Sequence, residues 1–278
     1  MKKTKEWIVA QEEEKDCWKS LKEKLLSDHY YQEKSNYWKK LIARINKTPS
    51  DFLIDKTLEV GCGPTGIFLL YNNKEEKTNY HLLDPLIESY KDLVPDYFKG
   101  FQAYECPIEN LDHSKINSYK YILAINCIDH CFDLDSFCES INKVSNDETD
   151  IYIAVNTHKR SSTAKFWRTF QKVLEPLHPY HFTSAEYNEI FQKFFTVQNI
   201  VDIEDLIIEV NNKTKESPEF GIKHFLRKIK KLPSLFHPRN ILFGILRMFN
   251  MPAHDFSGVG NSIYQHKLFV LKPRKATL

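Results

Sequence analysis

The stretch LEVGCGPTG, residues 58–66, decides the expected fold of this chain. Three of the eight glycines in the 278-residue sequence fall in it, at Gly61, Gly63 and Gly66. Missing side chains let a ligand approach the backbone and the N–H groups at the start of a helix. The apolar residues before the glycines predict a strand, so we expect a strand, a tight turn and a helix that together bind a nucleotide-like ligand. A tight turn without a ligand is the alternative.

Further short apolar segments lie on the carboxyl side of this stretch and alternate with helical patterns. This alternation predicts an α/β fold with a doubly wound, mostly parallel sheet. The expected strands are seven, at residues 57–61, 79–84, 101–105, 120–127, 150–156, 194–203 and 262–272.

An acidic residue stands where a ribose would bind. Asp84 follows Gly61 by 23 residues, at the end of the second expected strand. A carboxylate at this position can accept hydrogen bonds from both ribose hydroxyls. The alternative is that Asp84 only caps a helix.

Glu59-Val60-Gly61-Cys62-Gly63 resembles the first motif of class I S-adenosylmethionine-dependent methyltransferases, in which an acidic residue two positions before the first glycine is habitual. Residues 106–111 (CPIENL) resemble the family's segment that flanks adenine, and residues 121–130 (YILAINCIDH) its fourth strand and exit. The resemblance covers about residues 55–205 and the last strand. Pro64-Thr65 and a long insertion before the last strand depart from the family pattern.

The resemblance implies a Rossmann-like methyltransferase fold with S-adenosyl-L-methionine as the cofactor. The cofactor-binding residues that it implies are Glu59, Gly61, Gly63, Gly66, Asp84, Glu109, Asn110 and Asn126. No metal is expected. Zinc at Cys127, His130 and Cys131 is disfavoured, because apolar cysteines along a buried strand and the following helix explain the spacing equally well.

Methyl transfer requires alignment of donor and acceptor, and a base where the acceptor is a hydroxyl or a protonated amine. Histidine titrates near neutral pH, and we expect His130 and His181 as candidate catalytic bases. Candidate substrate-binding residues are Asp129, His158, His178 and Tyr180. The alternative for each histidine is a half-buried loop position.

Four regions are expected along the chain. Residues 1–50 form a helical extension of two amphipathic helices, which either pack on the core or cover a site; residues 51–203 form the cofactor-binding core; residues 204–261 form a basic helical insertion or cap; and residues 262–278 form the last strand and a tail.

The charges are unevenly distributed. The chain has 39 Lys and Arg against 37 Asp and Glu, yet residues 220–254 contain seven Lys and Arg and no acid. A basic amphipathic pair of helices over 222–250 could contact a membrane surface, bind an anionic substrate or cover the active-site mouth. Nucleic acid is disfavoured, because the segment lacks interleaved stacking aromatics and the chain lacks a base-methylation motif.

The expected function is therefore an S-adenosylmethionine-dependent methyltransferase that modifies oxygen or nitrogen of a small-molecule, sugar or lipid-linked acceptor. A nicotinamide-dependent oxidoreductase and a non-catalytic cofactor-binding scaffold are the alternatives. The sequence has no CxxC pair, no apolar amino-terminal signal and no apolar run of spanning length. We therefore expect a cytoplasmic location, with possible peripheral contact to a membrane; the oligomeric state is not indicated.

Overall fold

A computed structural model describes residues 5–116, 118–174, 180–206 and 264–274. The expected basic insertion lies outside the described residues except for positions 204–206, and so does His178.

Seven strands form one sheet in the order β3-β2-β1-β4-β5-β7-β6. The strands from β1 to β5 pair in parallel, and β7 is antiparallel to both β5 and β6. Their bounds are β1 Thr57–Val60, β2 Tyr80–Leu83, β3 Gln102–Tyr104, β4 Tyr121–Ile125, β5 Asp150–His158, β6 Phe195–Asp202 and β7 Tyr264–Pro273. This sheet confirms the predicted fold class. The strand order reverses between β1 and β4, and ligands of doubly wound sheets bind at the carboxyl ends of such strands.

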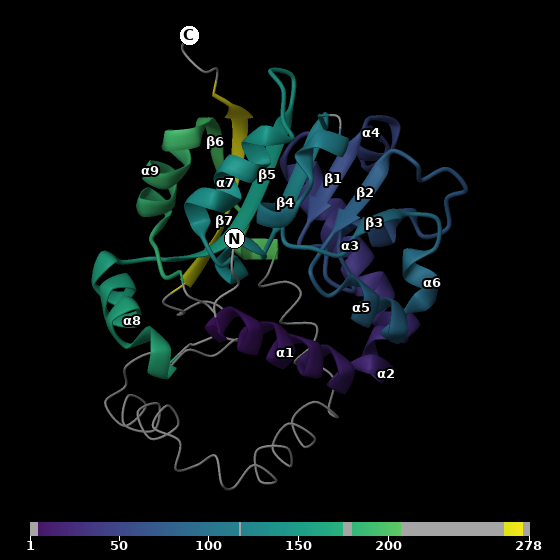
Figure 1. Ribbon diagram of the computed structural model, residues 1–278, viewed down its shortest axis with the longest axis horizontal. Helices are drawn as coiled ribbons and strands as arrows, with labels where there is room; N and C mark the ends of the chain where they lie inside the picture. The colour runs from purple at the N-terminus through teal and green to yellow at the C-terminus, as the bar shows by residue number, and fades with distance from the viewer. Residues whose placement is uncertain (1–4, 117, 175–179, 207–263, 275–278) are drawn as a thin grey trace, which may run out of the picture.

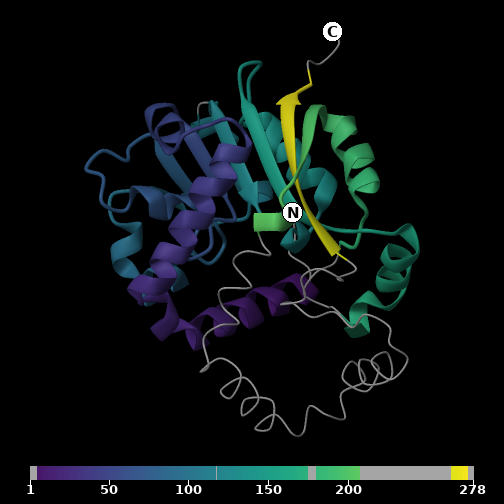
Figure 2. The ribbon, with the colours of Figure 1, turned by 180° about the vertical axis from the view of Figure 1, so that it is seen from behind.

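Helices cover both faces of the sheet (Figures 1 and 2). The helix α3 Asp28–Arg44 packs on one face with the 3-10 helix η1 Ile67–Tyr71 and α5 Ile87–Leu93, while α7 Leu134–Lys143 and α9 Ser184–Phe194 pack on the other. All four residues of β1 and of β2 are buried. The two polar residues of β1, Thr57 and Glu59, are buried with hydrogen-bond partners: the hydroxyl of Thr57 donates to the carbonyl of Phe52 at 2.7 Å, and Glu59 accepts the N–H of Ile67 at 2.6 Å.

Between residues 5 and 44, the structure shows three helices rather than the expected two: α1 Lys5–Ser20, α2 Lys22–Leu25 and α3. A new helix starts at Ser27, because its side chain accepts a hydrogen bond from the N–H of Tyr30. The other helices within the described ranges are α4 Pro49–Ile54, α6 Pro95–Phe98, α8 Ser161–Leu174 and the 3-10 helices η2 Ile108–Asn110, η3 His113–Lys115 and η4 Ile128–His130.

The helix expected after the glycine-rich turn is the short 3-10 helix η1 rather than an α-helix. The helix α9 begins with a capping box: Thr183 and Glu186 each accept, through the side chain, a backbone N–H of the other residue.

Of the amino-terminal helices, α3 packs on the core and α1 lies across the ends of the strands. In α3, the indole Nε1 of Trp38 donates to the carbonyl of Thr65 at 3.0 Å and so ties the glycine-rich turn to this helix. The helix α1 crosses below the carboxyl ends of the parallel strands (Figures 1 and 2). Both roles considered for this region from the sequence are therefore found, on different helices.

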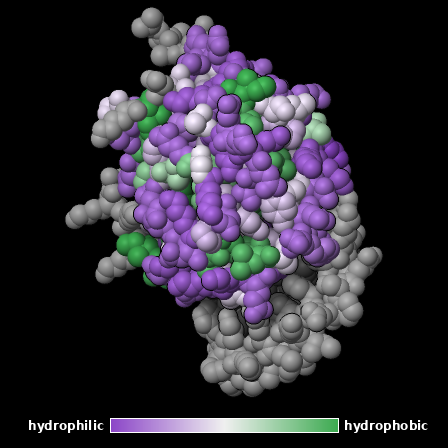
Figure 3. Space-filling model, turned by 90° about the vertical axis from the view of Figure 1, so that its right-hand side faces the viewer, coloured by the Kyte–Doolittle hydropathy of each residue, from purple (hydrophilic) through white to green (hydrophobic). Residues whose placement is uncertain are grey.

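The described surface beside the β3 edge of the sheet is mainly hydrophilic, with hydrophobic residues in small separate groups (Figure 3). Scattered apolar residues of this kind are normal on a protein surface. Within the described ranges, no helix has both the length and the apolar character needed to cross a bilayer.

Candidate functional site

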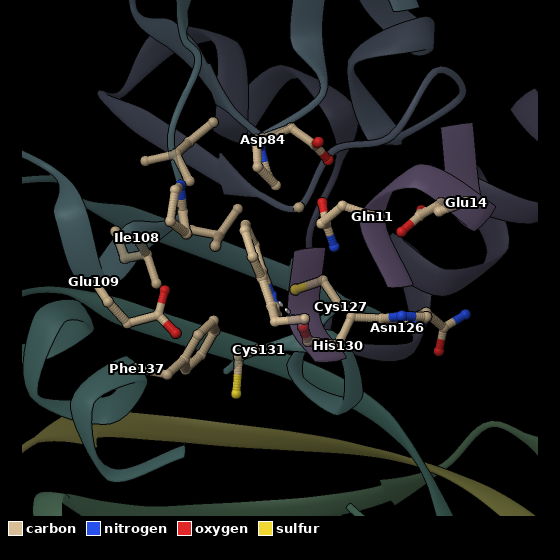
Figure 4. Close-up of a pocket in the computed structure, with 16 residues that line it drawn as sticks. Gln11, Glu14, Asp84, Ile108, Glu109, Asn126, Cys127, His130, Cys131 and Phe137 are labelled. Atoms are coloured by element: carbon tan, nitrogen blue, oxygen red, sulfur yellow. Dashed lines mark hydrogen bonds between the residues drawn. The ribbon is translucent and has the colours of Figure 1, made fainter. Parts of the chain in front are cut away.

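A pocket lies between the carboxyl ends of β1, β2 and β4 and the helix α1 (Figure 4), with about 530 Å³ of empty space that includes space open to solvent. The residues that line it are Trp7, Gln11, Glu14, Val60, Gly61, Leu83, Asp84, Pro85, Pro107, Ile108, Glu109, Asn126, Cys127, His130, Cys131 and Phe137.

Two glycines of the turn have positive φ angles, +63° at Gly61 and +55° at Gly63. A Cβ on Gly61 would lie 2.2 Å from the Cβ of Cys127, so the exits of β1 and β4 can approach this closely only with glycine. A Cβ on Gly63 would have no protein atom within 4 Å. The first glycine therefore allows close packing, and the second leaves open space beside the pocket.

Glu59 lies beneath the turn and does not line the pocket. Its carboxylate accepts hydrogen bonds from the N–H groups of Ile67 (2.6 Å) and Phe68 (3.0 Å) and from the hydroxyl of Tyr80 (3.0 Å). Burial raises the pKa of Glu59 to about 7, while the two backbone N–H groups lower it. Glycine at position 66 leaves room for the Glu59 carboxylate, because a Cβ there would lie 2.3 Å from a Glu59 oxygen.

Asp84 lines the pocket, and the turn holds its carboxylate in place. Its Oδ2 accepts the N–H of Gly63 at 3.0 Å, and its Oδ1 accepts the N–H of Leu86 at 2.9 Å. Burial, followed by the negative charge of Glu14, raises the pKa of Asp84 to about 7.

Glu109 faces the same pocket from η2 (Figure 4). Burial raises the pKa of this carboxyl to about 7, and its Oε1 is buried without a hydrogen-bond partner. Its neighbour Asn110, also implied by the resemblance, is not among the lining residues.

The exit of β4 places Asn126, Cys127, His130 and Cys131 on the pocket wall. Asn126 has a φ of +54°, a left-handed conformation that asparagine tolerates better than most side chains. Its N–H donates to the carbonyl of Ala154 at 2.9 Å, which fixes this bend against β5. Asp129 is buried behind the wall and does not line the pocket.

The second group of expected site residues lies elsewhere. His158 and His181 are buried and pair through Nε2 and Nδ1 at 3.3 Å. The ring of Tyr264 packs on His158 at 4.3 Å and that of Trp167 on His181 at 5.7 Å, measured between centroids. Tyr180 stacks on Phe182. None of these residues lines the pocket, so His130 lines it and His181 does not.

Sequence reasoning considered a cover over a site in this region but did not identify the residues of α1 that form it. Trp7, Gln11 and Glu14 line the pocket, and Trp18 follows on the same helical face. The indole Nε1 of Trp7 donates to the carbonyl of His130 at 3.0 Å, and its ring contacts Phe132 edge-on at 5.7 Å. Positions 7, 11, 14 and 18 have the helical spacing that marks one face, but this spacing does not indicate which surface the face contacts.

Neither a scan against protein-family models nor a search of curated proteins finds a match. Similar solved structures are found. A coclaurine N-methyltransferase bound to N-methylheliamine and S-adenosylhomocysteine is 15% identical, with a TM-score of 0.53 over 78% of this chain; the match covers 65% of that enzyme's length.

Two further similar structures show how widely this fold is used. The cyclopropane synthase MmaA2 from Mycobacterium tuberculosis is 13% identical, with a TM-score of 0.52 over 78% of this chain and 77% of its own. The [4+2]-cyclase SpnF is 9% identical, with a TM-score of 0.51 over 81% and 79%. One fold hosts different reactions, so these likenesses establish architecture. The chain has the Rossmann-like fold of class I S-adenosylmethionine-dependent methyltransferases.

Proposed function

We propose that this protein is a methyltransferase that uses S-adenosyl-L-methionine as its cofactor. The observation that carries the proposal is the position of Glu59. Its carboxylate accepts the N–H groups of Ile67 and Phe68, the first two residues of η1. In dinucleotide-binding folds, the N–H groups at this helix start bind the pyrophosphate. Here these N–H groups donate to a buried carboxylate instead of a pyrophosphate. This arrangement argues against the nicotinamide-dependent alternative.

The charges of the pocket support the same choice. Glu14, Asp84 and Glu109 line it, and no Lys or Arg stands among its described lining residues. Acidic walls suit a ligand with a sulfonium and an ammonium group, and they repel phosphates. The unpartnered buried oxygen of Glu109 provides an acceptor for a ligand N–H group such as that of adenine.

When bound, the cofactor would supply an electrophilic methyl group on its sulfonium. The protein residues would then have two tasks. Asp84 would hold the ribose, oriented by its bonds to Gly63 and Leu86, and Glu109 would hold the adenine edge. His130 lines the pocket at the exit of β4 and is our candidate base for a hydroxyl or protonated amine acceptor.

We propose a small-molecule acceptor that is methylated on oxygen or nitrogen, with sugar and lipid-linked compounds within this class. The first similar structure supports a small amine acceptor, because it is described with N-methylheliamine bound. A cytoplasmic location with peripheral membrane contact through 222–250 remains part of the proposal.

Calorimetry with S-adenosylmethionine, S-adenosylhomocysteine and NAD tests the cofactor. We expect the first two to bind, NAD not to bind, and Asp84→Ala to weaken S-adenosylmethionine binding by about 1.5–3 kcal/mol, the range for hydrogen bonds to a charged group. Asp92→Ala is the matched control, because Asp92 is exposed. Binding of NAD alone, or unchanged affinity in folded Asp84→Ala, would contradict the assignment.

The reaction requires its own test. We expect transfer of labelled methyl groups to members of a panel of amines and alcohols, and a loss of about 10²–10⁴ in turnover for His130→Ala with an alcohol acceptor. His181→Ala is compared in parallel, because His181 lies outside the pocket. Cofactor binding without transfer to any acceptor would favour the scaffold alternative.

A further inference from the structure

Gln11 of α1 is a buried polar side chain that faces the pocket. Its exposed fraction is 8%, and its Oε1 has no hydrogen-bond partner in the structure. Figure 4 draws its carboxamide beside Asp84 and Glu14, directed into the pocket. A buried amide oxygen without a partner destabilises the folded protein unless a ligand completes its hydrogen bonds.

Contacts on either side of Gln11 fix its position. One helical turn before it, Trp7 donates to the carbonyl of His130. On the other side, the carboxylate of Glu14 accepts the hydroxyl of Tyr90 and the indole N–H of Trp18, both at 3.4 Å. Glu14 and Trp7 are therefore already engaged with protein groups, whereas the Gln11 oxygen is available for a ligand.

The surroundings of Gln11 indicate what it would bind. Asp84 and Glu14 are close enough for the charge of Glu14 to raise the pKa of Asp84, so this end of the pocket is rich in acceptors. Glu109 lies on the other side of the pocket, and Ile108 and Phe137 stand beside it as apolar surfaces (Figure 4). This distribution matches a nucleoside whose base lies against apolar side chains and whose diol faces the acceptors.

We propose that the carboxamide of Gln11, which lies beside Asp84, accepts a hydrogen bond from a ribose hydroxyl of the cofactor. The amino-terminal helix is then part of the cofactor site as well as its cover. This inference rests on the proposed function, because it assumes an adenosine-containing ligand.

The test removes each partner of the proposed hydrogen bond in turn. Calorimetry compares S-adenosylhomocysteine with its 2′-deoxy and 3′-deoxy analogues on the wild type, on Gln11→Ala and on Gln32→Ala. Gln32 is an exposed helical glutamine of α3 and serves as the control. We expect Gln11→Ala to weaken S-adenosylhomocysteine binding by about two- to twelvefold, the effect of one neutral hydrogen bond. On the wild type, one of the two deoxy analogues should bind more weakly than S-adenosylhomocysteine by a similar factor. On Gln11→Ala, the same analogue and S-adenosylhomocysteine should bind with almost equal affinity.

A second variant keeps the inference testable if Gln11→Ala disturbs the packing of α1. Gln11→Met preserves most of the side-chain volume and removes the buried amide. We expect it to raise the melting temperature of the ligand-free protein while it weakens S-adenosylhomocysteine binding, because an unpartnered polar group is lost together with a ligand contact.

The outcomes separate the two proposals. If S-adenosylhomocysteine does not bind the wild type, the proposed function fails. If it binds with equal affinity to all variants, or if both deoxy analogues lose as much affinity on Gln11→Ala as on the wild type, the role of Gln11 is overturned and the cofactor assignment stands.

Discussion

The two walls of the pocket are built in different ways. On the sheet wall, backbone geometry fixes the polar groups: Gly61 allows the exits of β1 and β4 to touch, and the N–H groups of Gly63 and Leu86 hold Asp84. On the helix wall, α1 is held at its ends by side-chain contacts such as that of Trp7 with the carbonyl of His130. We infer that the sheet wall is nearly rigid and that the helix wall adjusts to its ligand.

The strongest way to break the sheet wall is Gly61→Ala. The new Cβ would lie 2.2 Å from the Cβ of Cys127, at a φ of +63°. We expect a loss of about 2–5 kcal/mol in unfolding free energy, the sum of left-handed strain and overpacking, together with loss of cofactor binding. Chemical denaturation and calorimetry measure the two effects.

Two further variants separate the steric clash with Cys127 from the backbone strain of the left-handed conformation. Gly63→Ala introduces a Cβ with no protein atom within 4 Å, so it should cost only the left-handed strain of about 1–2 kcal/mol. Cys127→Gly removes the clashing atom and should restore part of the stability of Gly61→Ala. If the double variant is no more stable than Gly61→Ala alone, the close approach of β1 and β4 is not the reason for glycine at this position.

This contrast also explains what the sequence could predict. The sheet wall has local signals: clustered glycines at residues 61, 63 and 66, an acid at position 84 and apolar strands buried on both faces. The fold followed from these, as did the presence of Asp84 at the pocket, whereas Glu109 was implied by the resemblance of residues 106–111 to the methyltransferase family. The place of Glu59 beneath the turn was missed, because only the folded turn and η1 bring the N–H groups of Ile67 and Phe68 to its carboxylate.

The sequence contains no comparable local signal for the position of α1 or for the placement of the histidines. The spacing of Trp7, Gln11 and Glu14 predicts a helix face but not its partner, because tertiary packing of α1 across the strand ends decides the contact. His130 and His181 follow neighbouring strands, so the sequence suggested a pair. The bridge between His158 and Thr183 instead brings His181 to His158.

A smaller effect should appear in the response of cofactor binding to pH. Burial raises the pKa of both Asp84 and Glu109 to about 7. Ionised carboxylates favour a cationic ligand, so the affinity for S-adenosylmethionine relative to uncharged-sulfur S-adenosylhomocysteine should rise from pH 6 to pH 8, by about tenfold for each group whose pKa falls by two units on binding. Glu109→Gln should reduce this rise. A constant affinity ratio across this range would contradict the electrostatic role of the pocket.

The same groups affect the stability of the ligand-free protein in the opposite direction. Their folded-state pKa values lie above the ordinary values near 4, so the folded protein binds more protons than the unfolded chain between about pH 4 and pH 7. Their contribution is full below pH 4 and is lost as the pH rises through about 7. The increase in melting temperature caused by S-adenosylmethionine should therefore be larger at pH 8 than at pH 6.

The smallest expected effect tests the helix wall itself. Trp7→Phe keeps an aromatic ring against Phe132 and removes the indole N–H that donates to the carbonyl of His130. One neutral hydrogen bond is worth about 0.5–1.5 kcal/mol, so cofactor affinity should fall about two- to twelvefold through weaker docking of α1. Hydrogen exchange of the α1 amides should accelerate while that of β1 and β4 stays unchanged, because the sheet wall does not depend on this contact. Trp18→Phe is the matched control, since its N–H reaches Glu14 only at 3.4 Å, and it should change affinity less. If exchange accelerates equally in β1 and α1, the two walls form one cooperative unit, and the inferred difference in rigidity is wrong.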